Sequence, residues 1–121
     1  MDTISHTSTL VVTNDNTAMA MDSGDLPVLA TPALVALMEN AAMLAARRIC
    51  DDGETTVGAS IEVKHLSPSP IGATITARAT LSNREGRKLS FSITAIENDK
   101  TIGTANHTRY IVNPEKFMSK I

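Results

Sequence analysis

The sequence predicts an α+β protein in which a long antiparallel sheet wraps around one central helix. The first observation is an apolar run from Thr31 to Ile49, which has the length and composition of a helix. The second is a series of later segments in which apolar and polar residues alternate, as in antiparallel strands with one wet face. The third is that the turn sequences between these segments are short, which favours hairpins. A chain of 121 residues fits a single domain, residues 1–121.

The first 30 residues are expected to be mostly irregular. Residues 7–12 can form a short strand and residues 17–21 a second one. The segment 22–29 contains Gly24 and Pro27 and is therefore predicted to be a loop.

The helix is predicted over residues 31–50. Thr31 is a suitable N-cap and Pro32 suits the first helical position. Arg47 and Arg48 fall in the last turn, where cations interact favourably with the helix dipole. Because the helix is apolar on nearly every side, we expect it to be covered over most of its surface.

Four alternating segments predict the strands of the sheet. They cover residues 57–65, 71–82, 89–95 and 101–112, with turns near 83–86 and 97–100. In the first of them the odd-numbered residues Val57, Ala59, Ile61 and Val63 are apolar and are expected to face the helix. His65 continues this parity, so an imidazole is predicted at the end of the buried face.

Glu39 is the most unusual residue of the helix. Its neighbours three and four positions away are all apolar: Val35, Ala36, Ala42 and Met43. Burying an unpaired carboxylate costs several kcal/mol, so a partner outside the helix must make its charge tolerable. A reacting site that holds a cationic or hydrogen-bonding partner is the obvious candidate. The predicted strand parity would place His65 on a surface that faces Glu39.

Composition excludes several classes of function. A net charge of −2 without a basic, aromatic-rich stripe argues against nucleic-acid binding. The single cysteine, Cys50, cannot form an internal disulfide, and no Cys/His cluster has the spacing of a metal site. The N-terminus does not resemble a signal peptide, and no uncharged apolar stretch is long enough for a membrane span. We therefore expect a soluble, cytoplasmic protein with no metal.

Few large side chains are available for a core. The chain has no Trp, one Tyr and two Phe, so a second subunit is expected to complete the hydrophobic interior. This predicts a homodimer or a dimer of dimers.

Four segments, in this order and spacing, resemble a known family. They are TPALVALMENAA, VGASIEVKHLSPSPIG, EGRKLSF and IGTANHTRYIVNPEKF, and together they cover most of residues 28–118. The chain resembles the hotdog-fold acyl-CoA thioesterase superfamily, and within it the fluoroacetyl-CoA thioesterase branch. No single motif is highly specific, and the order of the four segments carries the resemblance.

The resemblance implies a hotdog fold and hydrolysis of an acyl-CoA. In that family a Thr at the helix start, a Glu in mid-helix and a His at a strand end act together, and Thr31, Glu39 and His65 match them. The long strands of the family carry a Gly and an Arg close to the thioester, and Gly58 and Arg109 match these. The family also implies a dimer in which both subunits build each site. Coenzyme A enters as part of the substrate, with no separate cofactor.

The chain departs from the family where the acyl group is selected. The fluoroacetyl-specific member has phenylalanines in the segment before the helix, forming a lid, whereas MDSGDLPVLA here has no aromatic residue. Asn40 stands where that member has a large aromatic residue. Leu26, Val28 and Leu29 remain to close a pocket. We therefore predict a short-chain acyl-CoA substrate without marked selectivity for fluorine.

Other interpretations stay open from the sequence. Thr31 could be a nucleophile, position a water molecule or merely cap the helix. Glu39 could form a structural ion pair with an Arg. The protein as a whole could be a non-catalytic acyl-CoA-binding module, or another hotdog enzyme such as an enoyl-CoA hydratase. The hydratase class has a pattern with an Asp and a His in one short motif, and this motif is not found in the sequence.

Overall fold

The computed structural model describes residues 3–121, in which five strands and two helices follow one another along the chain. These elements are β1 (Ser5–Val11), α1 (Thr31–Arg47), β2 (Thr55–His65), β3 (Thr74–Glu85), β4 (Lys88–Glu97), β5 (Lys100–Val112) and α2 (Pro114–Met118). The strands form one antiparallel sheet in the order β1-β3-β4-β5-β2. The predicted α+β class, with a long antiparallel sheet and one main helix, is confirmed.

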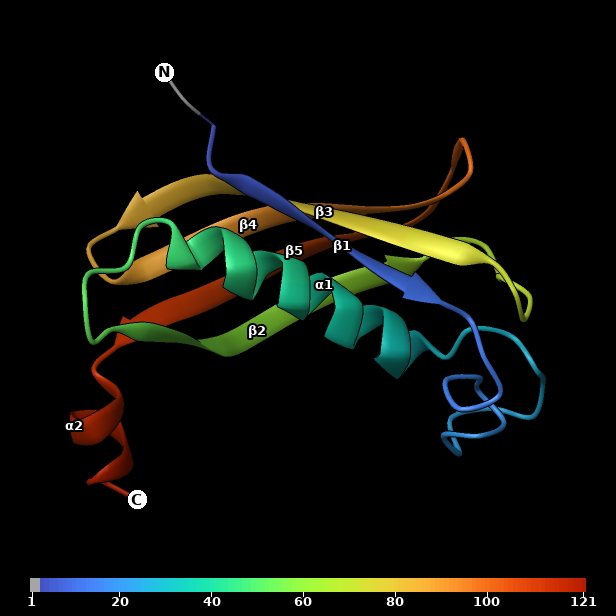
Figure 1. Cartoon of the computed structure of the whole chain (residues 1–121), viewed down its shortest axis with the longest axis horizontal. Helices are drawn as coiled ribbons and strands as arrows, with labels where there is room; N and C mark the ends of the chain where they lie inside the picture. Colours follow the sequence, from blue (N-terminus) through green and yellow to red (C-terminus); the bar gives the residue numbers. More distant parts are fainter. Residues whose placement is uncertain (1–2) are drawn as a thin grey trace.

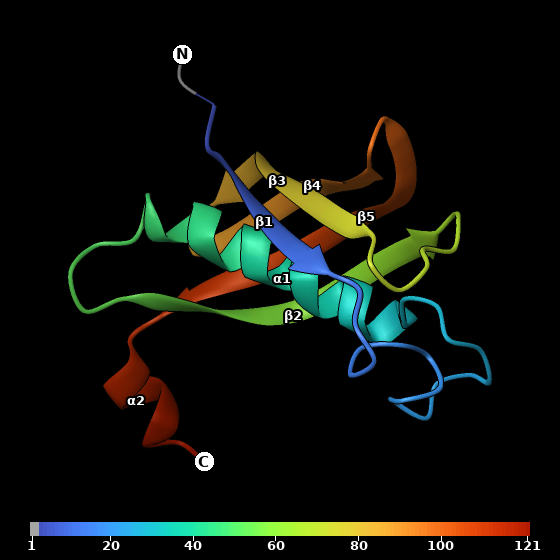
Figure 2. The same ribbon diagram turned by 45° about the vertical axis from the view of Figure 1, so that its right-hand side comes forward.

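Helix α1 lies across one face of the twisted sheet, mainly over β1 and β3, whereas the short α2 projects from the end of β5 (Figures 1 and 2). β1 and β2 are the two edge strands. The free edge of β2 carries backbone groups that no strand within residues 3–121 pairs, so this edge can accept another strand.

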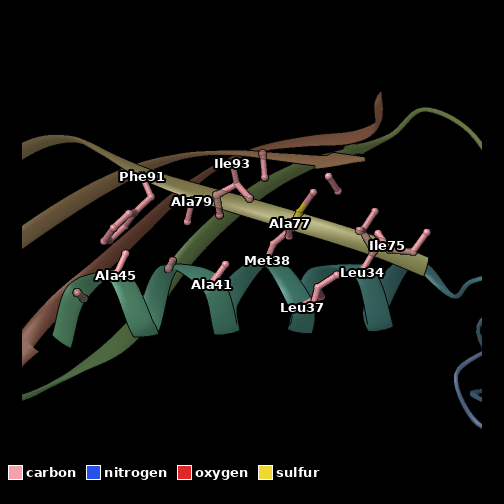
Figure 3. Packing of buried hydrophobic residues seen from close by; sticks show 14 of the residues in the cluster. Leu34, Leu37, Met38, Ala41, Ala45, Ile75, Ala77, Ala79, Phe91 and Ile93 are labelled. Atoms are coloured by element: carbon pink, nitrogen blue, oxygen red, sulfur yellow. The ribbon is translucent and has the colours of Figure 1, made fainter. Parts of the chain in front are cut away.

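The core fills the space between α1 and the sheet (Figure 3). On the helix, Leu34, Met38, Ala41 and Ala45 are fully buried and point toward the sheet, where Phe91 is the largest buried side chain. Alanines on both surfaces, including Ala77 and Ala79 of β3, let the helix approach the sheet closely. The scarcity of aromatic residues is thus offset by a short distance between the two layers.

The expectation that α1 is covered on most of its surface is wrong for the single chain. The sheet covers one stripe of the helix, while Ala36 and Asn40 are exposed and Val35 and Met43 are only half-buried. Glu39 lies on this partly open side, with its side chain 43% exposed. The helix is apolar beyond the stripe that its own sheet covers, which leaves an apolar surface for a further contact.

The predicted parity of β2 is correct for only half of the strand. A β-bulge shifts the register between Gly58 and Ser60, so that Ala59 has no partner on β5. Beyond the bulge Ile61 and His65 pair with inward-facing residues of β5, as predicted. Before it, the even-numbered residues face the helix: Thr56 is buried and Gly58 lies against Glu39. Val57 and Ala59 therefore do not face the helix, because one extra residue inverts the alternation.

Other boundaries differ slightly from the predictions. The α1 helix ends at Arg47 rather than near residue 50, and β3 begins at Thr74. Instead of a second strand at 17–21, Thr17 forms one isolated bridge with Leu29. Of the two helices in residues 3–121, neither is long and apolar enough to cross a membrane.

Candidate active site

Thr31 and His65 are joined by a hydrogen bond. Thr31 Oγ1 lies 2.8 Å from His65 Nδ1, and the two residues come from the first turn of α1 and the last position of β2. The N-cap of α1 is Ala30, and no side chain caps the helix. The interpretation of Thr31 as a helix cap is therefore wrong: Thr31 is the first helical residue, and its hydroxyl faces the imidazole instead.

The ring of His65 has one satisfied nitrogen and one unsatisfied nitrogen. Nε2 is buried and has no hydrogen-bond partner within residues 3–121. Burial lowers the pKa of His65, and the nearby backbone of Ser67 offsets part of this shift. Ser67 is nevertheless not a hydrogen-bond partner of Nε2. The imidazole is accordingly neutral at pH 7, and a neutral ring can accept the Thr31 proton on Nδ1 while Nε2 carries its own hydrogen.

Glu39 belongs to a second cluster, with Arg109 and Gly58. Its carboxylate Oε2 lies 3.8 Å from Nη1 of Arg109, a residue that is only 6% exposed. A Cβ atom at Gly58 would stand 2.7 Å from the same carboxylate oxygen, so only glycine leaves room for Glu39 here. Together, Ala36, Glu39, Asn40, Met43 and Arg109 line an open pocket of about 280 Å³.

Arg109 is anchored by neighbours that the sequence did not single out. Its Nε donates to Thr56 Oγ1 at 2.9 Å, and its Nη2 donates to the backbone oxygen of Thr56 at 3.2 Å. Its Nη1 lies 3.2 Å from Nε2 of His107. The burial of Arg109 lowers its pKa, and Glu39 opposes that change. Neither Thr56 nor His107 was among the predicted site residues; the shared parity of His107 and Arg109 on one strand was the available signal.

Within one chain the two clusters stay separate. Thr31 and Glu39 are eight residues apart on α1, which corresponds to about 12 Å along the helix axis. Across residues 3–121 no hydrogen bond or ion pair joins Glu39 to Thr31 or His65. The expectation that Glu39 and His65 face each other is therefore not met inside a single chain, because they lie over different parts of β2.

The segment before α1 lies beside the Thr31–His65 pair. Val28, Leu29 and Ser23 line a second open pocket of about 280 Å³ together with Thr31 and His65. Leu26, which was expected to help close a pocket, does not line it and is 65% exposed. The wall next to the paired hydroxyl and imidazole thus combines aliphatic side chains with serines and has no aromatic ring.

The two clusters supply complementary chemistry. A hydroxyl bonded to a neutral imidazole is the arrangement needed to activate an oxygen nucleophile. A carboxylate beside a guanidinium can stabilise charge or orient a proton-bearing group. In the described part of the chain, no three His, Cys, Asp or Glu side chains gather as metal ligands would.

Known proteins share this arrangement of elements. Residues 12–115 match the family model for the fluoroacetyl-CoA-specific thioesterase FlK. A fluoroacetyl-CoA thioesterase of Streptantibioticus cattleyicolor is 37% identical over 94 residues, which cover 78% of this chain and 68% of that protein.

Solved structures agree with this match. A mutant of FlK crystallised with fluoroacetate and CoA superposes with a TM-score of 0.86, at 33% identity, over 94% of each chain. A hot-dog-like protein from Thermanaerovibrio acidaminovorans has the same fold at 20% identity, with a TM-score of 0.86, over 96% of this chain and 86% of that one. The helix and sheet described above are therefore those of a hotdog fold.

Proposed function

Because this chain belongs to the fluoroacetyl-CoA-specific thioesterase family and is an acyl-CoA thioesterase, we propose that it hydrolyses a short-chain acyl-CoA with Thr31, His65 and Glu39. The observation that carries the assignment of residues is the 2.8 Å hydrogen bond between Thr31 Oγ1 and His65 Nδ1. A threonine that served only the helix would cap the backbone, and this one does not.

The unsatisfied Nε2 of His65 points to a missing acceptor. A buried N–H without a partner costs about 1–3 kcal/mol, so a complete site needs an acceptor next to it. A carboxylate is the natural choice, because it also stabilises the imidazolium that forms when His65 takes a proton. We assign this role to Glu39 of a second copy, since Glu39 of the same chain lies too far along α1.

A pair of β2 edges can bring these groups together. If two copies of β2 pair antiparallel around a two-fold axis at Glu62, the extra residue of the bulge brings Gly58 of one copy opposite His65 of the other. Directly opposed residues point to the same face of a sheet, and Gly58 and His65 both face the helix side. Such a dimer would place His65 beside Glu39 of the second copy and would cover the exposed apolar side of α1.

In this site the reaction proceeds by acyl transfer. Thr31 Oγ1 attacks the thioester carbonyl carbon while its proton passes to His65 Nδ1. The tetrahedral intermediate collapses, the C–S bond breaks, and the CoA thiolate leaves with the proton from His65. Water, deprotonated by the same imidazole, then cleaves the threonine ester, which releases the carboxylic acid and restores the hydroxyl. Backbone N–H groups near Gly58 and the Arg109 guanidinium stabilise the oxyanion.

The acyl pocket favours a small group without selecting fluorine. In the proposed dimer its walls would be Ala36, Asn40 and Met43 of one copy and Val28 and Leu29 of the other, with no aromatic side chain among them. Asn40 accepts a hydrogen bond of 2.7 Å from Ser8, so its amide is held at the rim. A flexible methionine adapts to several acyl groups, whereas a rigid aromatic lid would discriminate between them.

The nucleotide end of CoA requires cations outside the acyl pocket. A pocket of about 300 Å³ at the end of β5 is lined by Arg87, Lys116, Lys120 and the partly exposed ring of Phe117. Ile111 also lines it and lies two residues from Arg109 on the same face of β5, a separation of roughly 7 Å. We assign this pocket to the phosphates and adenine of CoA, because it combines positive charge with an aromatic surface.

The test is an assay of hydrolysis of acetyl-, fluoroacetyl-, butyryl- and hexanoyl-CoA, in which the free thiol that is released is measured. We expect turnover of the short chains, with kcat/KM for acetyl- and fluoroacetyl-CoA within about tenfold of each other. A preference for fluoroacetyl-CoA of several orders of magnitude would contradict the assigned specificity. Binding of these esters without any turnover would instead identify an acyl-CoA-binding module.

A further inference from the structure

His107 forms the centre of a buried polar chain beneath the candidate site. It is 3% exposed, and its Nδ1 lies 2.7 Å from the backbone oxygen of Ser60. Its Nε2 lies 3.2 Å from Nη1 of Arg109, which in turn lies 3.8 Å from the Glu39 carboxylate. This series of polar contacts therefore connects the bulge of β2, through His107 and Arg109, to Glu39 on α1.

These contacts determine the protonation state of His107. A backbone carbonyl can only accept, so the hydrogen bond to Ser60 requires the proton on Nδ1. The guanidinium can only donate, so Nε2 must present its lone pair to Arg109. Both bonds form only when the ring is neutral. Burial lowers the pKa of His107, while the Ser60 hydrogen bond opposes the shift and the Arg109 charge adds to it.

Within residues 3–121, Arg109 and Glu39 are the charged groups that act on the pKa of this ring. Of the elements around it, β5 contributes Arg109 and α1 contributes Glu39. β2 contributes the Ser60 carbonyl, and β4 contributes Phe91, whose ring centre is 6.5 Å away. Protonation of His107 would thus place a second cation against Arg109 and would remove the acceptor for Nη1.

We propose that His107 is a positioning residue for thioester hydrolysis: it accepts from Arg109 Nη1 and so holds the guanidinium against Glu39 at the opening beside Gly58. Thr56 holds Nε and Nη2 of Arg109, and His107 holds Nη1. The orientation of the Arg109 guanidinium next to the thioester therefore depends on both residues. This role rests on the proposed function, since Arg109 and Glu39 act in it.

Two substitutions separate positioning from packing. His107→Gln keeps an acceptor near the position of Nε2 but loses the bond to Ser60, whereas His107→Asn keeps a donor near Nδ1 and leaves Arg109 without its acceptor. We expect His107→Asn to lower kcat for acetyl-CoA by roughly 10- to 100-fold with KM little changed, the scale of a misplaced catalytic group. His107→Gln should retain most of kcat, although the melting temperature falls in both variants. Equal losses of kcat in the two variants, in step with stability, would overturn the proposal.

A measurement on Arg109 itself is independent of turnover. In the ¹⁵N-labelled wild-type protein, the guanidinium N–H signals of Arg109 should show hindered rotation, and acidification that protonates His107 should abolish it. An Arg109 signal that is unchanged when His107 titrates would contradict the proposal even if no variant folds. If Arg109 responds but wild type hydrolyses no acyl-CoA, the positioning of Arg109 holds and the proposed function fails.

Discussion

The hydroxyl of Thr31 is bound to an imidazole although it stands at a helix terminus. A threonine at the start of a helix ordinarily satisfies a free backbone N–H, and here Ala30 occupies the cap position without a side-chain bond. The helix thus forgoes a capping interaction worth about 1 kcal/mol, while the hydroxyl is directed at His65. At this residue the hydroxyl contacts the imidazole and does not stabilise the end of the helix.

Substitutions of Thr31 test this directly. Thr31→Val keeps the shape but removes the hydroxyl, so we expect kcat to fall at least about 100-fold while the melting temperature hardly changes. Thr31→Ser is the matched control, because it retains the nucleophile and should keep substantial activity. Mass spectrometry of the acid-quenched enzyme should show an acyl group on residue 31. A fully active Thr31→Val would disprove the nucleophilic role.

The pH dependence of the reaction follows from His65. In the proposed mechanism the reacting form is the neutral ring, and burial lowers the pKa of His65 from its ordinary value of 6.5. Activity should therefore persist through pH 7 and fall on the acid side, with a midpoint of kcat/KM below 6.5. Folding stability should change in the same direction: the native state binds fewer protons, so stability declines as pH falls below the unfolded pKa. An acid limb centred above pH 7 would exclude His65 as the base.

The bulge in β2 is the element that builds the second cluster. By inserting Ala59 it turns Gly58 toward α1, and it is followed directly by Ser60, whose carbonyl holds His107. Bulges recur next to active sites because they redirect side chains without breaking the sheet. Here the redirected residue is a glycine, whose missing side chain leaves space for Glu39.

A methyl group at position 58 should displace that carboxylate. In Gly58→Ala the new Cβ would meet Glu39 Oε2 at 2.7 Å and Arg109 Nη1 at 3.3 Å. We expect kcat to fall by roughly 100-fold in steady-state assays. The double variant Gly58→Ala with Glu39→Gln provides the control, because both changes act on one group and should not add. Fully additive losses would show that Gly58 acts independently of Glu39.

The short helix α2 should contribute to binding of CoA rather than to chemistry. Lys116 and Lys120 line the pocket at the end of β5 without an ion pair in the described part of the chain. Lys116→Glu should raise KM for acetyl-CoA several-fold with kcat unchanged, and added salt should narrow the difference from wild type. N-acetylcysteamine thioesters, which lack the nucleotide, serve as the control and should show no such change. An equal effect on KM for both substrates would show that this pocket does not bind the nucleotide part of CoA.

At the scale of the whole molecule, the candidate residues of one chain form two separate clusters. Thr31 and His65 lie at one end of α1, Glu39 and Arg109 lie near its middle, and β2 presents a free edge between them. In the proposed dimer, a second copy paired through that edge would bring each cluster next to the other cluster of its partner. The apolar side of α1, left open by its own sheet, is the surface that this pairing would cover.

Complementation distinguishes a shared site from a site within one chain. Glu39→Gln and His65→Ala should each abolish most hydrolysis alone. In a mixed dimer, isolated through two different affinity tags, one site combines the intact Glu39 of one chain with the intact Thr31 and His65 of the other. We expect this dimer to recover about half of the wild-type activity, with both homodimers as controls. A mixed dimer that stays inactive, or a wild-type protein that is monomeric by light scattering, would refute the shared site.

The sequence by itself determined the elements of this protein and the identity of its unusual residues. The apolar run of α1 and the alternation in the later strands reflect local periodicity, which is readable without long-range information. A carboxylate amid apolar residues at Glu39 and a histidine at the end of β2 stood out for the same reason. Segments in the right order were enough to indicate the family.

Only the tertiary structure decided how those residues meet. The bulge at Ala59 inverts the parity of half a strand, and one extra residue leaves no clear mark on a pattern with a period of two. The hydrogen bonds of Thr31 with His65 and of His107 with Ser60 each join residues more than 30 positions apart. Glu39 is half-exposed rather than buried, because the burial of a helix face depends on which elements pack against it.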